Sequence, residues 1–258
     1  MYKKAAVWIV LIAALCTVFY SLYKICEIQL LYAAGDQKYE ELQERVTIVE
    51  EEQSTSASTS GAGESIFPLV VDFKALEQIS EDTVAWLYCP DTVINYPVMW
   101  ADDYDWYLHH LPDGTYHVNG SLFLDYNCAQ DFSGNLSIIY GHNMKSGKMF
   151  HSLKKYKKQA YFEEHPYMYL YTGEGNYRID LMYGCVIGAG EWRERAFMYE
   201  INLNSLMSYA AVRTTFKSNV SYTEGSQVIA LSTCSYEFDD ARYVVLGILV
   251  PEYENAAR

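Results

Sequence analysis

Residues 227–250 read QVIALSTC, SYEFDDA and RYVVLGILV in succession. The first and third runs have the apolar, β-branched composition of strands, and the middle run is polar enough to be the loop that connects them. Because side chains alternate along a strand, a period of two places Cys234 on the same face as Val228 and at the end of its strand. If the two strands pair as a hairpin, Cys234 and Arg242 lie side by side at one end.

Such a hairpin would bring a guanidinium next to a thiol. An arginine beside a cysteine favours the thiolate, and its planar fork of donors can hold a developing oxyanion. Both properties serve acyl transfer, with Cys234 as nucleophile and Arg242 as oxyanion stabiliser. A structural interpretation stays open on these two residues alone: Arg242 could pair with Asp239 or Asp240 at the surface, while Cys234 packs as a small hydrophobe.

A third strand-like run, residues 136–142, ends in His142 and is followed by a turn over residues 143–147. An imidazole at a strand end that faces a loop is placed for proton transfer rather than for core packing. The five other histidines fall in a helical stretch, in a polar turn or on a helix surface, and we predict them to be structural or exposed: His109, His110, His117, His151 and His165. His142 is therefore the candidate acid/base.

Short strand-like runs dominate the chain from residue 67 onward. They cover residues 83–89, 93–99, 121–126, 136–142, 167–172, 177–187, 227–234 and 242–250. Helical stretches interrupt them at residues 72–79, 103–110, 148–157 and 203–217. Many short strands with turns between them predict a mainly β barrel or sandwich that carries a few helices.

The N-terminal region predicts a membrane anchor. Residues 5–22 form a nearly uninterrupted apolar run with lysines on both sides, which matches the roughly 18 to 20 residues needed to span a bilayer. A cleaved signal peptide fits less well because the small pair Ala33-Ala34 lies too far downstream, and a lipoprotein signal fails because Leu15 precedes Cys16. The lysines next to the span place the short N-terminal side in the cytoplasm.

These observations predict four segments in the chain. Residues 1–4 form a cytoplasmic N-terminus, 5–24 the transmembrane anchor, 25–66 a helical stalk followed by a Ser/Thr/Gly-rich tether, and 67–258 an extracellular catalytic domain. Within the third segment, residues 37–53 are dense in Glu and Gln and predict a solvated helix. Residues 54–65 have nothing to bury and predict a flexible linker.

Composition excludes several other functions. The formal net charge of −14 argues against a nucleic-acid partner, which would need a basic surface to replace condensed counterions. The six cysteines include no C-x-x-C pair and no Cys/His run at zinc-binding spacing, so we predict no structural metal. Their irregular spacing does not suggest a disulfide framework.

Two segments carry a resemblance to a known family. The sequences YGHNM at 140–144 and LSTC at 231–234, followed by Arg242, resemble the signature of the sortases, the transpeptidases that attach surface proteins to the cell wall of Gram-positive bacteria. Three further runs resemble class B sortases in particular: INYPV at 94–98, GSLFLDY at 120–126 and HPYMYLY at 165–171. The resemblance extends from about residue 72 to residue 249.

The resemblance implies a fold and a set of site residues. The fold would be mainly β with helices, an eight-stranded β-barrel with an extra helix, residues 203–217, between the sixth and seventh strands. Cys234 would be the nucleophile, His142 the acid/base and Arg242 the third catalytic residue. The groove for the sorting signal would be lined by Leu108, Tyr140, Ser232 and Thr233.

The chain departs from the family pattern in two places. The loop between Cys234 and Arg242 is shorter than in some class B members. Tyr104 stands where some relatives carry a polar residue, so the side-chain selectivity of the groove does not carry over. The acidic calcium-binding loops of some class A members are not evident, and we predict neither a metal nor a cofactor.

By resemblance, the enzyme would cleave a C-terminal sorting signal after Thr through a thioacyl-enzyme and pass the acyl group to an amine of a peptidoglycan precursor such as lipid II. Class B relatives favour signals that open with Asn-Pro or Ser-Pro, continue with any residue and Thr, and end in Gly or Asn; many act on haem-uptake proteins. One alternative is a pilin-polymerising sortase, but no lid segment is evident before Phe67. Others are a non-catalytic binding domain, which would not need all three residues, and a secreted cysteine protease, which would need an Asn or Asp orienter near His142.

Overall fold

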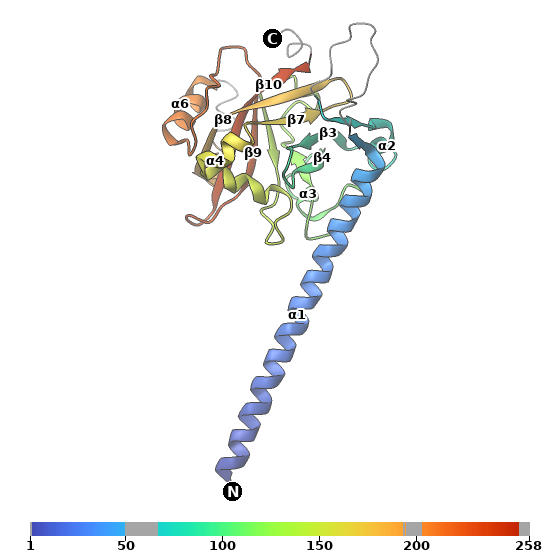
Figure 1. Cartoon of the computed structure of the whole chain (residues 1–258), viewed down its shortest axis with the longest axis vertical. Coiled ribbons are helices and arrows are strands. Elements are labelled where there is room, and N and C mark those ends of the chain that lie inside the picture. The colour runs from blue at the N-terminus through green and yellow to red at the C-terminus, as the bar shows by residue number, and fades with distance from the viewer. Residues whose placement is uncertain (1, 50–66, 193, 195–202, 253–258) are drawn as a thin grey trace, which may run out of the picture.

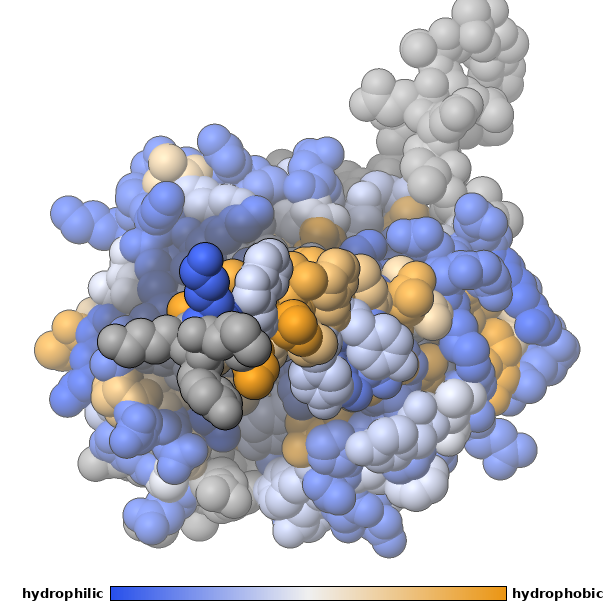
Figure 2. Space-filling model, turned by 90° about the horizontal axis from the view of Figure 1, so that it is seen from below, coloured by the Kyte–Doolittle hydropathy of each residue, from blue (hydrophilic) through white to orange (hydrophobic). Residues whose placement is uncertain are grey.

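The computed structural model describes residues 2–49, 67–192, 194 and 203–252. Its two parts are a long N-terminal helix, α1 (Tyr2–Val46), and a β-barrel carried at the C-terminal end of that helix (Figure 1). Seen from below, along α1, hydrophobic surface is concentrated in a band over the projecting helix, and the underside of the barrel around it is mostly hydrophilic (Figure 2).

Eight strands close into one barrel in the order β10-β8-β7-β3-β4-β5-β6-β9. Their bounds are β3 (Thr83–Tyr88), β4 (Asn95–Met99), β5 (Leu122–Leu124), β6 (Leu136–Tyr140), β7 (Tyr167–Tyr171), β8 (Asn176–Gly188), β9 (Val228–Cys234) and β10 (Ala241–Pro251). The pairs β4–β5 and β6–β9 are parallel and the other pairs are antiparallel. The predicted eight-stranded barrel is confirmed, and the sandwich alternative is excluded because every barrel strand has two neighbours.

The helices decorate the outside of the barrel. Those whose bounds the structure describes are α2 (Phe73–Glu77), α3 (Trp106–His109), the 3₁₀-helix η1 (Phe150–Lys157), α4 (Gln159–Glu164) and α6 (Leu203–Arg213). Because α6 lies between β8 and β9, the sixth and seventh strands of the barrel in chain order, the predicted extra helix is confirmed, although it ends at Arg213 rather than residue 217. Its apolar face, at helical spacing, packs into a cluster with strands β8, β9 and β10 through Leu203, Leu206, Met207 and Ala210.

The end of α1 is part of the folded unit, so the prediction of a solvated stalk is wrong here. Tyr39, Leu42 and Val46 are buried in the main core cluster. The Tyr39 hydroxyl donates to the carbonyl oxygen of Gly120 at 2.6 Å, and Gln43 Nε2 donates to the carbonyl oxygen of Asn95, also at 2.6 Å. These three buried residues are spaced by three and four positions, so they form one apolar stripe along the helix. The stripe is not evident from the composition of residues 37–53, which is rich in Glu and Gln.

A two-stranded antiparallel sheet follows the helix. Strand β1 (Thr47–Val49) pairs with β2 (Leu69–Val71), in register from Thr47 with Val71 to Val49 with Leu69. The structured region therefore begins well before residue 67. The predicted linker at residues 54–65 lies outside the described residues.

The remainder of α1 has the properties of a membrane span by length and composition. A helical segment, Ala6–Val46, contains an apolar window long enough to cross a bilayer, and none of that window is buried inside the structure. Large apolar side chains along it are more than half exposed, including Val7, Trp8, Ile9 and Phe19.

Candidate active site

Strands β9 and β10 form the predicted hairpin. Arg242 is the direct register partner of Cys234, and the Ser235 N–H donates to the carbonyl oxygen of Ala241 at 2.9 Å to close the loop end. Directly opposite residues of an antiparallel pair point to the same face. The thiol and the guanidinium are thus carried side by side on one face at one end of the barrel.

The side chain of Arg242 is half-buried, and its hydrogen bonds go to backbone rather than to carboxylates. Its Nη1 donates to the carbonyl oxygens of Ala241 at 3.1 Å and Asp240 at 3.4 Å. Among the described residues, no ion pair joins Arg242 to Asp239 or Asp240. The alternative interpretation, in which Arg242 pairs with Asp239 or Asp240 at the surface, therefore lacks the ion pair that it requires.

His142 was predicted to end its strand, but β6 stops at Tyr140, so His142 lies two residues beyond the observed strand end, in the segment that follows β6. Its Nε2 is 2.8 Å from the carbonyl oxygen of Leu108. A carbonyl can only accept, so Nε2 carries a proton in this arrangement and Nδ1 is left to exchange one. Burial lowers the pKa of His142, although the hydrogen bond to Leu108 opposes that effect.

One groove of about 290 Å³ is lined by all seven of the predicted catalytic and substrate-binding residues. It is lined by Cys234, His142, Arg242, Leu108, Tyr140, Ser232 and Thr233. Tyr104, Phe123 and Trp192 also line it. The groove is largely apolar in its side chains and has its thiol, imidazole and guanidinium in one place, which suits a peptide held in extended form next to a nucleophile.

Parallel pairing of β6 with β9 connects the histidine segment to the cysteine strand. Tyr140 is the register partner of Ser232, and the Gly141 N–H donates to the Ser232 carbonyl oxygen at 3.2 Å. The Thr233 hydroxyl donates to the carbonyl oxygen of Gly141 at 2.7 Å, so this hydroxyl is occupied within the protein. The Ser232 hydroxyl, in contrast, is buried with no hydrogen-bond partner among the described residues.

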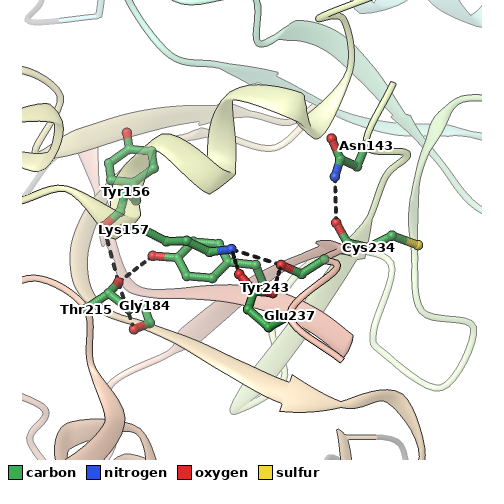
Figure 3. Close-up of polar contacts among 9 residues, drawn as sticks. Asn143, Tyr156, Lys157, Gly184, Thr215, Cys234, Glu237 and Tyr243 are labelled. Atoms are coloured by element: carbon green, nitrogen blue, oxygen red, sulfur yellow. Dashed lines mark hydrogen bonds and ion pairs between the residues drawn. The ribbon is translucent and has the colours of Figure 1, made fainter. Parts of the chain in front are cut away.

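Asn143 is a site residue that sequence reasoning missed. Its Nδ2 donates to the carbonyl oxygen of Cys234 at 2.8 Å (Figure 3). This bond joins the peptide unit of Cys234 to the residue next to His142. The signal in the sequence is its position directly after His142 in YGHN, but the segment that it begins, residues 143–147, predicts only a turn.

A second missed feature is the buried carboxylate of Asp125 under the groove. Tyr104 and Tyr140 both donate to it through their hydroxyls, at 3.1 Å and 2.8 Å, and Asn127 donates from its backbone N–H at 3.0 Å. These donors satisfy a charge that would otherwise be costly to bury. They also fix the two tyrosine rings that form one wall of the groove.

Metal binding has no geometric basis in the part of the chain that the structure describes. No group of three or more His, Cys, Asp or Glu side chains converges there as metal ligands would.

A barrel that presents a cysteine and an arginine in register, with a histidine in the same groove, defines a cysteine transpeptidase of the sortase type. No family model matches the chain. Sortase B of Listeria monocytogenes is 32% identical over 183 residues, covering 69% of this chain and 74% of the relative. Sortase B of Staphylococcus aureus is 25% identical over 214 residues, covering 82% and 86%. The chain belongs to the class B sortases.

Solved structures agree with this assignment. A crystal structure of sortase B from Bacillus anthracis superposes with a TM-score of 0.68 at 27% identity, covering 86% of this chain and 99% of that one. A Staphylococcus aureus sortase B–substrate complex superposes with a TM-score of 0.64 at 25% identity, covering 69% and 84%.

Proposed function

We propose that this sortase cleaves the sorting signal of surface proteins after Thr and transfers the acyl group to an amine of a peptidoglycan precursor. The observation that carries the proposal is the register pairing of Cys234 with Arg242, in a groove that His142 also lines. These three side chains supply the nucleophile, the charge stabilisation and the proton transfer that the reaction requires.

In the first half-reaction, the Cys234 thiolate attacks the carbonyl carbon of the Thr residue. The resulting oxyanion is held by the guanidinium of Arg242 together with a backbone N–H. The C–N bond then breaks, and the imidazolium of His142 donates its proton to the departing amine. The products are a released C-terminal peptide and a thioester on Cys234.

In the second half-reaction, an amine replaces the thiol. The amine nitrogen of a precursor such as lipid II attacks the thioester carbonyl, neutral His142 takes the proton that the amine loses, and the thiolate of Cys234 leaves. The oxyanion again lies at Arg242. The surface protein is thereby joined to the cell-wall precursor through a new amide bond.

The long apolar helix supports a membrane location for this chemistry. We place residues 1–4 in the cytoplasm, residues 5–24 in the bilayer and the barrel outside the cell, as the flanking lysines predict. A sorting signal and lipid II are both tethered to the same membrane. Confining the enzyme to that surface raises the effective concentration of both substrates.

The groove suits a short extended peptide, and the family favours signals of the form Asn-Pro or Ser-Pro, any residue, Thr, and then Gly or Asn. Incubation of the full-length enzyme with a library of such peptides, followed by intact-mass spectrometry, tests the proposal. We expect an acyl adduct on Cys234 whose mass corresponds to the peptide fragment that ends at Thr. We expect no adduct with peptides in which Ala replaces Thr. An adduct that ends at another residue, or no adduct with any member, would overturn it.

A further inference from the structure

We propose that Lys157, Glu237 and Ser235 form a clamp that positions Cys234 and Arg242 for reaction. The clamp rests on the proposed roles of those two residues. None of its members touches the groove, so they are positioning residues rather than catalytic ones.

The loop between the two reactive residues needs an external support. Residues 235–240 project from the barrel end, with the Tyr236 side chain 74% and the Phe238 side chain 52% exposed. Asp240 has a φ of 59°, in the left-handed region, where the loop turns back into β10. Few buried contacts hold such a tip, yet its two ends carry the thiol and the guanidinium.

Lys157 supplies that support from outside the hairpin. It is the last residue of η1, and its Nζ donates to the Ser235 hydroxyl at 2.9 Å and forms an ion pair with the Glu237 carboxylate. The Ser235 hydroxyl in turn donates to the same carboxylate. The three side chains thus close a hydrogen-bonded ring directly after Cys234, and Figure 3 shows Lys157 and Glu237 within it.

The same ammonium group also contacts the other side of the hairpin. Lys157 Nζ lies 5.0 Å from the centroid of the Tyr243 ring, a cation–π distance. Ser235 directly follows Cys234, and Tyr243 directly follows Arg242. One lysine therefore contacts the residue next to each reactive side chain.

Buried contacts anchor the base of the clamp. The hydroxyls of Tyr243 and Thr215 hydrogen-bond at 2.6 Å, and the Thr215 hydroxyl also lies 3.2 Å from the carbonyl oxygens of Tyr156 and Gly184 (Figure 3). Tyr156 is buried and precedes Lys157 on η1. Lys157, the clamp member outside the loop, is thus carried next to a buried residue of η1, and this places the support for the exposed loop on the barrel.

The negative charge of the clamp lies on the Glu237 carboxylate. Partial burial of Glu237 would raise its pKa, but hydrogen bonds from Lys157 and Ser235 outweigh this effect and lower the pKa to about 2. The Glu237 carboxylate is therefore ionised at neutral pH and can accept from both Lys157 and Ser235.

Ion pairs that are open to solvent often contribute little to folding stability. The clamp therefore predicts a specific effect on rate rather than on stability. A displacement of about 1 Å between a nucleophile and its stabilising group can cost roughly a hundredfold in rate. Loosening the loop on one side, with Asn143 still holding the Cys234 carbonyl oxygen on the other, should cost about tenfold.

The test compares Lys157→Met, Glu237→Gln and the double variant with Lys158→Met, a control that removes an exposed lysine one position along the chain. Peptide cleavage is normalised to titrated active sites, and melting temperature is measured in parallel. We expect each single variant to lose about tenfold in kcat with KM within about twofold of wild type. The double variant should also lose about tenfold rather than a hundredfold, because residues that act as one unit are not additive.

Several results would overturn the clamp. These are a kcat within about twofold of the Lys158→Met control, a loss confined to KM, or a double variant that loses about a hundredfold. Cys234→Ala, measured alongside, separates this failure from failure of the proposed function. Turnover in Cys234→Ala would contradict the proposed role of Cys234. An inactive Cys234→Ala together with clamp variants of normal activity would contradict only the proposal of the clamp.

Discussion

The side-chain amide of Asn143 donates a 2.8 Å hydrogen bond to the carbonyl oxygen of Cys234. The two residues are 91 positions apart, and the bond crosses from the segment that carries His142 to the strand that carries Cys234, the proposed nucleophile. Together with the Thr233 hydroxyl on the Gly141 carbonyl, it sets the spacing between imidazole and thiol. Two short side chains thus align two halves of the site that the chain brings together only on folding.

Replacing Asn143 should therefore reduce rate. Asn143→Ala removes a hydrogen bond with a net contribution of about 1 kcal/mol, and we expect kcat/KM for a cleaved peptide to fall about fivefold. Asn143→Asp should lose more, because a carboxylate faces the same carbonyl oxygen and repels it. Steady-state cleavage of both variants checks this, and an aspartate variant as active as the alanine variant would contradict the assigned bond.

Cys234, the proposed nucleophile, gives the simplest prediction. Cys234→Ala should abolish both peptide cleavage and the acyl adduct, because no other described thiol lines the groove. The melting temperature should stay close to that of wild type, since the side chain is only partly buried at the strand end. Residual turnover above the background of denatured enzyme would contradict the proposed mechanism.

Arg242 can be distinguished from an ordinary surface charge by substitution with lysine. Lysine keeps the positive charge but loses the planar fork of donors, so Arg242→Lys should lower kcat by about 10²-fold, as loss of an oxyanion donor does. Stability should barely change, because within the part of the chain that the structure describes the guanidinium donates only to the carbonyl oxygens of Asp240 and Ala241. A preserved rate would mean that the arginine acts only as a distant charge.

Sequence alone predicted the features that are local in the chain. The hairpin from residue 227 to residue 250 was predictable because two strand-like runs flank one polar loop, and register then placed Cys234 opposite Arg242. The groove residue Leu108 came only from family resemblance. Nothing in its own segment indicates that its carbonyl oxygen accepts from His142.

Contacts between distant segments were not predictable in this way. The clamp joins Lys157 to Glu237 across 80 positions, and each residue alone looks like a solvated charge. The docking of α1 on the barrel failed for a different reason. Its apolar stripe consists of only three residues, Tyr39, Leu42 and Val46, in a charged stretch of α1, so composition masked the helical periodicity.

That docking can be tested through stability. Leu42 on α1 is buried in the core cluster, so Leu42→Ala should lower the free energy of unfolding by roughly 2 kcal/mol. Glu44→Ala, at an exposed position on the same helix, is the matched control and should change it by less than about 0.5 kcal/mol. Chemical denaturation of the full-length protein in detergent measures both, and equal small effects would show that the helix is not docked in solution.

The pH dependence follows from the chemistry of the two titrating groups. Attack needs a thiolate and an imidazolium together, but ordinary pKa values near 8.5 for a thiol and 6.5 for an imidazole leave about 1% of molecules with both. Burial lowers the pKa of His142 further, which makes this fraction smaller and moves the acid limb of activity to lower pH.

Activity should accordingly be slow and bell-shaped in pH. Below the pKa of His142 the dominant form is thiol with imidazolium, so activity falls as pH decreases through a value under 6.5. On the alkaline side activity falls as the imidazolium is lost from the thiolate form. Alkylation of Cys234 by a small electrophile, measured against pH in wild type and in His142→Ala, separates the two groups. We expect sluggish labelling at neutral pH, rising in one step with thiolate formation and little altered by His142→Ala. Fast labelling that persists down to about pH 5 would instead reveal a preformed ion pair.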